Sequence, residues 1–146
     1  MKRIVSALSA ILFSSVILCG CLPRGETQTL DQIYSEAHTA YMAASPLQVP
    51  GDLAQTVSTL NSKLQALVDG NAKNFRDDTK EIAQILADIT PRTGFTSRAA
   101  FGEISSQYRL FEPSASVDQT SAKVKLLVAR TYSMLTGELQ TTRFGL

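Results

Sequence analysis

Cysteine is scarce in this chain of 146 residues, and tryptophan is absent. The two cysteines, Cys19 and Cys21, lie close to the N-terminus, and no cysteine follows them. The chain beyond residue 21 therefore has no internal disulfide, no cysteine-ligated zinc site and no thiol nucleophile. Its stability must come from the burial of aliphatic and aromatic side chains.

Sequence patterns typical of catalysis are also missing. The chain has no Gly-x-Ser-x-Gly sequence, no P-loop and no glycine pattern of a dinucleotide-binding fold. A serine hydrolase needs a histidine base, and His38 is the only histidine. We therefore expect no enzyme and no catalytic residues.

One long apolar run is present, and it is confined to the N-terminus. Lys2 and Arg3 precede the run 4–18, which only serines interrupt. A permanent membrane helix needs about 20 apolar residues to cross a core of about 30 Å, so this run is short for that purpose. Its layout is that of the hydrophobic region of a cleaved export signal.

The end of this run carries a specific motif. Leu18-Cys19-Gly20-Cys21 resembles the lipobox of bacterial lipoprotein precursors, in which an aliphatic residue stands three positions before the lipidated cysteine and small residues lie between them. Leu18, Gly20 and Cys21 match, and Cys19 is small although less usual there. Lipidation of Cys19 would place Leu18 where the family has a small residue, so Cys21 is the expected site. The resemblance covers only about the first 21 residues.

The resemblance implies cleavage before Cys21, a diacylglyceryl group on its thiol and an N-acyl chain on its amino group. Two or more acyl chains give stable attachment to a bilayer. Leu22 follows the cysteine where aspartate commonly marks inner-membrane retention, so the outer membrane, facing the periplasm, is favoured. The alternative is an ordinary signal peptide or a signal anchor, either of which leaves Cys21 unmodified.

These boundaries divide the chain into four parts. We expect a signal peptide over 1–20, a lipidated N-terminus and tether over 21–28, a helical domain over 29–140 and a flexible tail over 141–146. After cleavage the chain retains 12 basic and 13 acidic residues. Binding to nucleic acid as a main function requires a basic excess, so none is expected.

Apolar residues beyond the tether recur at helical spacing, and no sustained alternation typical of a strand appears. Thr29-x-x-Gln32 is a capping box for a first helix that should end near Ser45-Pro46, before a loop over 47–51. Asp52 is the expected cap of the next helix. Ser97 and Ser116 are the expected caps of the last two, the second of which should run to about residue 139. The predicted fold is all-α: a small antiparallel bundle of four to five helices.

The stretch 52–90 is ambiguous. Leu53 and Ile89 lie 36 residues, or ten helical turns, apart, so one long helix would keep a single apolar stripe. Asp69-Gly70-Asn71 is a typical helix end, however, and we favour two helices.

Three groups of side chains are candidates for chemistry or binding. His38 with Met134 would be a haem pair, but a hydrogen-bonded histidine at the edge of the core is favoured. Asp77, Asp78 and Glu81 alternate with basic residues, as on a solvated helix face. The third group is aromatic and basic, as protein-binding surfaces often are, and it is a candidate partner surface, although core packing of its rings is the favoured interpretation. It consists of Phe101, Tyr108, Phe111, Arg98 and Arg109.

The function expected from these observations is that of a non-catalytic accessory module. It would be anchored to the bilayer through Cys21 and would bind another protein of the bacterial envelope. The alternative is a bundle that carries a lipid or another hydrophobic ligand in an interior cavity. No metal and no cofactor are expected apart from the covalent lipid.

Overall fold

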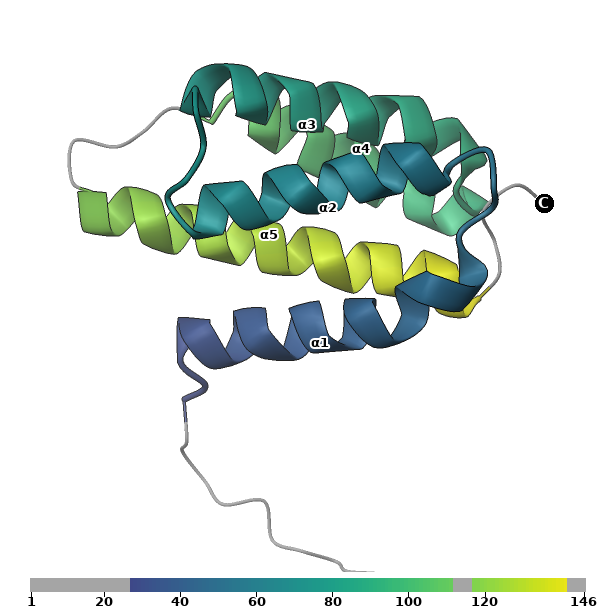
Figure 1. Ribbon diagram of the computed structural model, residues 1–146, viewed down its shortest axis with the longest axis horizontal. Helices are drawn as coiled ribbons and strands as arrows, with labels where there is room; N and C mark the ends of the chain where they lie inside the picture. The colour runs from purple at the N-terminus through teal and green to yellow at the C-terminus, as the bar shows by residue number, and fades with distance from the viewer. Residues whose placement is uncertain (1–26, 112–116, 142–146) are drawn as a thin grey trace, which may run out of the picture.

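The computed structural model describes residues 27–111 and 117–141, and over these ranges it contains helices and no strands. The predicted all-α bundle is therefore confirmed (Figure 1). A short 3-10 turn, Thr90–Arg92, precedes the fourth of the five α-helices. The α-helices are α1 (Leu30–Gln48), α2 (Ala54–Val68), α3 (Phe75–Ile89), α4 (Phe95–Arg109) and α5 (Val117–Gln140).

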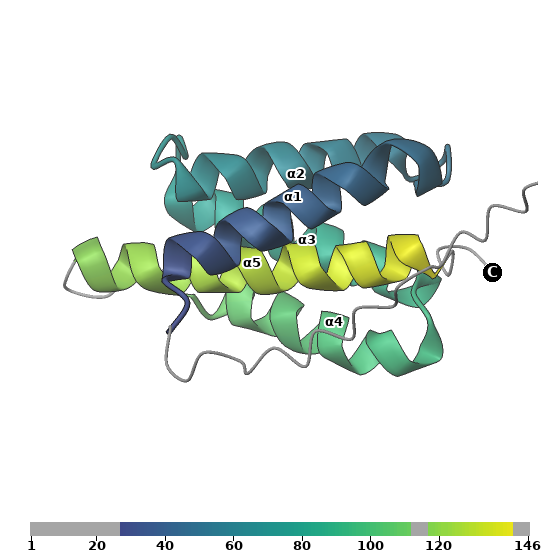
Figure 2. The same cartoon turned by 90° about the horizontal axis from the view of Figure 1, so that it is seen from below.

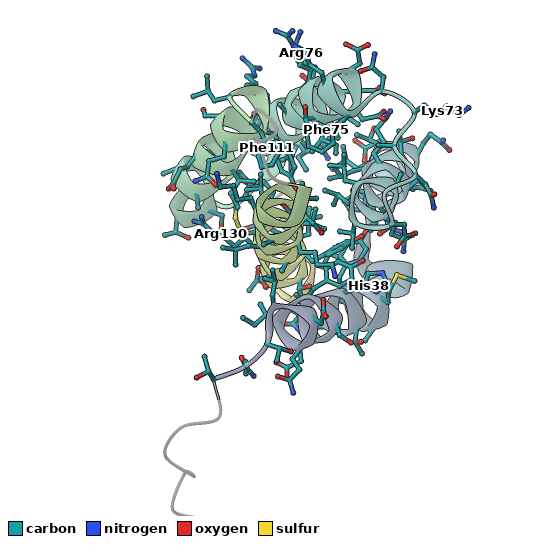
Figure 3. All side chains as sticks on the ribbon, turned by 90° about the vertical axis from the view of Figure 1, so that its left-hand side faces the viewer. His38, Lys73, Phe75, Arg76, Phe111 and Arg130 are labelled. Carbon is teal, nitrogen blue, oxygen red and sulfur yellow. The ribbon has the colours of Figure 1, made fainter. Side chains whose placement is uncertain are left out.

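Helix α5 is the centre of the bundle. It packs against α1, α2 and α4, while α3 packs against α2 and α4 (Figures 1 and 3). Consecutive helices run in opposite directions, so α1 and α5 run parallel to each other side by side (Figures 1 and 2). The first residues of α1 and α5 and the last residues of α4 thus lie at the same end of the molecule.

The core is continuous and mostly aliphatic, with three fully buried tyrosines. All five α-helices contribute side chains to it. Its largest fully buried side chains are Tyr41, Tyr108, Tyr132, Phe101, Leu60, Leu64, Ile82, Leu86, Ile89, Ile104, Leu135 and Leu139.

The start of α1 is as predicted, and its end is not. The Thr29 hydroxyl accepts from the Gln32 backbone N–H at 3.3 Å, and the Gln32 side chain accepts from the Thr29 N–H at 2.7 Å. This completes the capping box. The helix does not stop at Ser45-Pro46 but continues to Gln48. Pro46 removes only one backbone donor, and the helix ends within one turn of it.

The stretch 52–90 forms two helices, as favoured. Gly70 has φ +70°, a left-handed conformation in which glycine is least strained. The Asn71 N–H donates back to the Ala66 carbonyl at 2.9 Å, which closes the end of α2 in a Schellman-type turn. The chain then reverses, and Asn74 caps α3 by accepting from the Asp77 N–H at 3.3 Å.

Two predicted caps are wrong. Asp52 does not cap α2, whose cap position is Leu53; instead its carboxylate pairs with Arg92 at 2.6 Å. Ser97 lies inside α4, because that helix begins two residues earlier, at Phe95. Helix α2 has no side-chain cap, whereas the beginning of α4 is held by a residue distant in sequence, Glu138, which accepts from the Gly94 N–H.

Several predictions fall outside the described residues. They concern the signal and lipobox over 1–21, the cap at Ser116 and most of the tail over 141–146. Within the described ranges, no helix combines the length and apolarity needed to cross a membrane.

Candidate functional site

The candidate aromatic and basic surface is not formed as one patch, and the favoured core packing is confirmed for two of its rings. Phe101 and Tyr108 are each 1% exposed, so both rings belong to the core rather than to a docking surface. The Tyr108 hydroxyl lies 3.0 Å from the Thr131 hydroxyl on α5. Burial raises the pKa of Tyr108 far above its usual value, although this hydrogen bond opposes the rise. The two rings are buried because they lie on the face of α4 that α3 and α5 cover.

The other three members of that group lie apart. Phe111 is half-buried and packs on Phe75 of α3, with ring centroids 5.3 Å apart (Figure 3). Arg98 donates to the backbone carbonyls of Pro91 and Thr93, which holds the turn before α4. Arg109 is exposed in the last turn of α4. Only Phe111 and Arg109 therefore lie close to a surface feature, the groove described next.

A groove runs between α4 and α5 near the end where α1 begins. It encloses about 500 Å³, and most of its surface is apolar. Two of its leucines are exposed: Leu110 is 81% exposed and Leu126 is 46% exposed. Its lining residues are Glu103, Ser106, Gln107, Leu110, Phe111, Lys123, Leu126, Leu127 and Arg130.

The charged residues of the groove are mostly basic. Arg130 lies 3.8 Å from the exposed Glu103 carboxylate, a contact too long and too exposed to be strong. Lys123 forms no ion pair with any residue in the described ranges. Arg109, the neighbour of Leu110, likewise has no acidic partner there. The groove thus combines a mostly apolar lining with two basic residues, Lys123 and Arg130, and one acidic residue, Glu103.

An ion pair joins α5, one of the two helices of the groove, to the beginning of α1. The Lys125 ammonium on α5 contacts the Asp31 carboxylate in the first turn of α1 at 2.6 Å. Lys125 lies between two groove residues, Lys123 and Leu126. The chain therefore enters the domain at the same end as the groove, through a contact on another face of α5.

His38 lies elsewhere and has structural partners. Its Nε2 is 3.0 Å from the Gln65 amide nitrogen, and its ring stacks on Tyr34 at 5.8 Å. Tyr132 of α5 is 5.1 Å away and donates to the Asn61 side chain at 2.8 Å. This cluster joins α1 and α2 to α5, as predicted for a histidine at the edge of the core.

Met134 has different neighbours from His38. It lines a shallow pocket with Phe101 and Glu138, between α4 and α5. No group of three His, Cys, Asp or Glu side chains within the described ranges is arranged to hold a metal ion. Nothing in the geometry supports a haem pair.

The carboxylates of α3 bind a lysine rather than a metal. Lys63 of α2 contacts Asp78 at 2.9 Å and Glu81 at 2.7 Å. The Lys63 hydrogen bond holds the pKa of Asp78 below its usual value. Reading these residues as a solvated face is therefore incomplete, because two of the three cross-link α2 and α3.

Comparison with known protein families, with curated proteins and with solved structures gave no match for this chain. The groove is thus the main candidate site on geometry alone. Sequence reasoning missed it because Leu110 and Leu126 fall outside the core stripes of their helices. The signal in the sequence was an apolar residue outside the core-facing side of its helix, which indicates an exposed apolar surface.

Proposed function

We propose that this protein is a lipid-anchored, non-catalytic accessory module of a bacterial envelope, held to the bilayer through Cys21. The observation that carries the proposal is where the fold begins. The capping box closes α1 at Thr29, and Thr27 and Gln28 before it are exposed. The bundle thus begins eight positions after Cys21, which leaves residues 21–28 as the length of a tether.

The accessory role is supported by how the polar groups are used. His38 bonds to Gln65, Asp78 and Glu81 bind Lys63, and Glu138 bonds to the backbone at the start of α4. These groups hold helices together, so none of them is poised to act on a substrate. A module of this kind would act by binding another envelope protein.

Mild-detergent purification of the full-length tagged protein, followed by mass spectrometry, tests the proposal. We expect a diacylglyceryl group on Cys21 and an envelope protein recovered in fixed proportion. Cys21→Ala is the matched control, because it removes the lipid and leaves the described bundle untouched. An unmodified Cys21, or a lipidated protein recovered without any partner, would contradict the respective half of the proposal.

A second function, the binding of a hydrophobic ligand, is favoured by the apolar groove of about 500 Å³. That volume lies within the range of small-molecule sites. Solvent extraction of the purified protein and mass spectrometry of the extract would show a non-covalent ligand in constant ratio to protein. A clean extract, together with no binding of an acyl-chain probe, would exclude it.

A further inference from the structure

We propose that the groove between α4 and α5 rests on the anionic surface of the bilayer that holds the anchor, with Leu110 and Leu126 turned into the interface. This inference rests on the proposed function, because it takes the lipid on Cys21 as given. It adds an orientation: one stated side of the bundle faces the membrane.

The length of the tether limits the distance between the helical domain and the bilayer. Thr27, where the described chain begins, is six positions after Cys21. Fully extended, this segment spans about 20 Å, at roughly 3.3–3.6 Å per residue. The beginning of the described chain therefore stays within that distance of the headgroups.

The entry point lies at the same end of the bundle as the groove. The Asp31–Lys125 contact joins the first turn of α1 to α5 at the level of groove residues Lys123 and Leu126, on another face of α5. The same end of the molecule carries the last turn of α4, with Arg109 and Leu110 (Figures 1 and 2). A tether of this length attached at this point brings the groove, rather than the far end of the bundle, to the bilayer.

The side chains of the groove suit an interface between water and lipid. Leu110 and Leu126 expose aliphatic surface, which gains free energy on leaving water. Lys123 and Arg109 are basic and have no acidic partner among the described residues, and anionic headgroups attract such groups. Aliphatic side chains bordered by cations are the composition of protein surfaces that bind membranes from one side.

Because the protein is anchored by its lipid, a small groove surface is sufficient for contact with the bilayer. Once the lipid is inserted, contact between groove and bilayer is intramolecular and benefits from a high effective concentration. In this orientation α2 and α3 face away from the membrane, where an envelope partner has access to them.

Site-specific labelling of the lipidated full-length protein tests this orientation. Because the processed chain has Cys21 as its sole cysteine, Leu126→Cys and Met42→Cys each introduce one free thiol. Met42 is the matched control: it is also 46% exposed and apolar, but it lies on α1 away from the groove. Each variant carries a polarity-sensitive fluorophore and is reconstituted into phosphatidylethanolamine–phosphatidylglycerol vesicles that contain a lipid-attached quencher.

We expect the label at 126 to shift to the blue and to be quenched several-fold more than the label at 42. Phosphatidylcholine vesicles should reduce the difference, and so should Lys123→Glu. Lys80→Glu, an exposed charge reversal on α3, should leave it unchanged. Equal quenching at the two sites, on protein that floats with the vesicles, would overturn the orientation while leaving the anchor proposal intact.

Two other results would each overturn the inference in a recognisable way. A blue shift at 126 that appears in detergent without vesicles and grows with protein concentration would assign the groove to a second copy of the chain. Protein that fails to float, with an unmodified Cys21 by mass spectrometry, would refute the anchor itself, and with it the orientation.

Discussion

Glu138, near the end of α5, caps the beginning of α4. Its Oε2 accepts a hydrogen bond from the Gly94 N–H at 2.9 Å, although the two residues are 44 positions apart in sequence. Glu138 is only 2% exposed. Helix α4 has no capping side chain of its own, and a carboxylate is favoured where backbone N–H groups of a helix start point outward.

Glu138→Ala should therefore destabilise the protein by about 1–2 kcal/mol, the usual cost of losing a cap. Glu138→Gln keeps an acceptor oxygen and should cost less. Urea unfolding followed by circular dichroism measures both variants. Glu103→Ala is the control, because that carboxylate is exposed. If it lowered the free energy of unfolding as much as Glu138→Ala does, the cap at Gly94 would not be the cause of the loss.

Phe101 and Leu110 lie at the middle and the end of α4 and should respond in opposite ways to truncation. Phe101→Ala removes a ring that is 1% exposed and should cost about 3–5 kcal/mol. Leu110→Ala changes a side chain that is 81% exposed and should stay within about 0.5 kcal/mol of wild type. Thermal unfolding distinguishes them. A Phe101→Ala protein as stable as wild type would contradict the burial of this ring.

Replacing either of two glycines by alanine should change the stability of the protein, in opposite directions. Gly70 has φ +70°, so Gly70→Ala should cost about 1–2 kcal/mol through backbone strain. Gly137 lies within α5 with open space where a Cβ would stand, so Gly137→Ala should stabilise by up to about 1 kcal/mol. Both are measured by denaturant unfolding. If Gly70→Ala were neutral or stabilising, the break between α2 and α3 would not depend on the left-handed turn.

Alkaline pH should unfold the protein through its buried tyrosines. Burial raises the pKa of Tyr108 and of Tyr132, and for Tyr132 the neighbouring Tyr34 and Tyr41 add to the rise. The folded state then keeps protons that the unfolded chain releases above about pH 10. Stability is therefore complete below that pH and falls by up to about 1.4 kcal/mol per pH unit for each tyrosine above it.

Urea titrations between neutral pH and strongly alkaline pH measure this slope. Tyr108→Phe removes one titrating group and should make the slope shallower, whatever it does to stability at neutral pH. An unchanged slope in this variant would mean that Tyr108 already titrates normally in the folded protein.

The sequence by itself determined the class of fold and much of its core. Apolar residues at helical spacing predicted the helices, and the structure buries two such pairs four positions apart, Leu60 with Leu64 and Ile82 with Leu86. The capping box at Thr29 and the turn at Gly70 could also be predicted, because each depends on neighbours within a few residues. The anchor at Cys21 is likewise a local signal, and it remains a prediction.

Tertiary structure alone decided the features that join distant parts of the chain. Asp52 is drawn to Arg92 instead of capping α2, and Glu138 supplies the cap that Ser97 was expected to provide. Which face of α4 is covered depends on α3 and α5, so the burial of Phe101 and the exposure of Leu110 were open until the helices were packed. Helical periodicity defines the apolar face of a helix, whereas a groove between two helices arises only from the way they are placed.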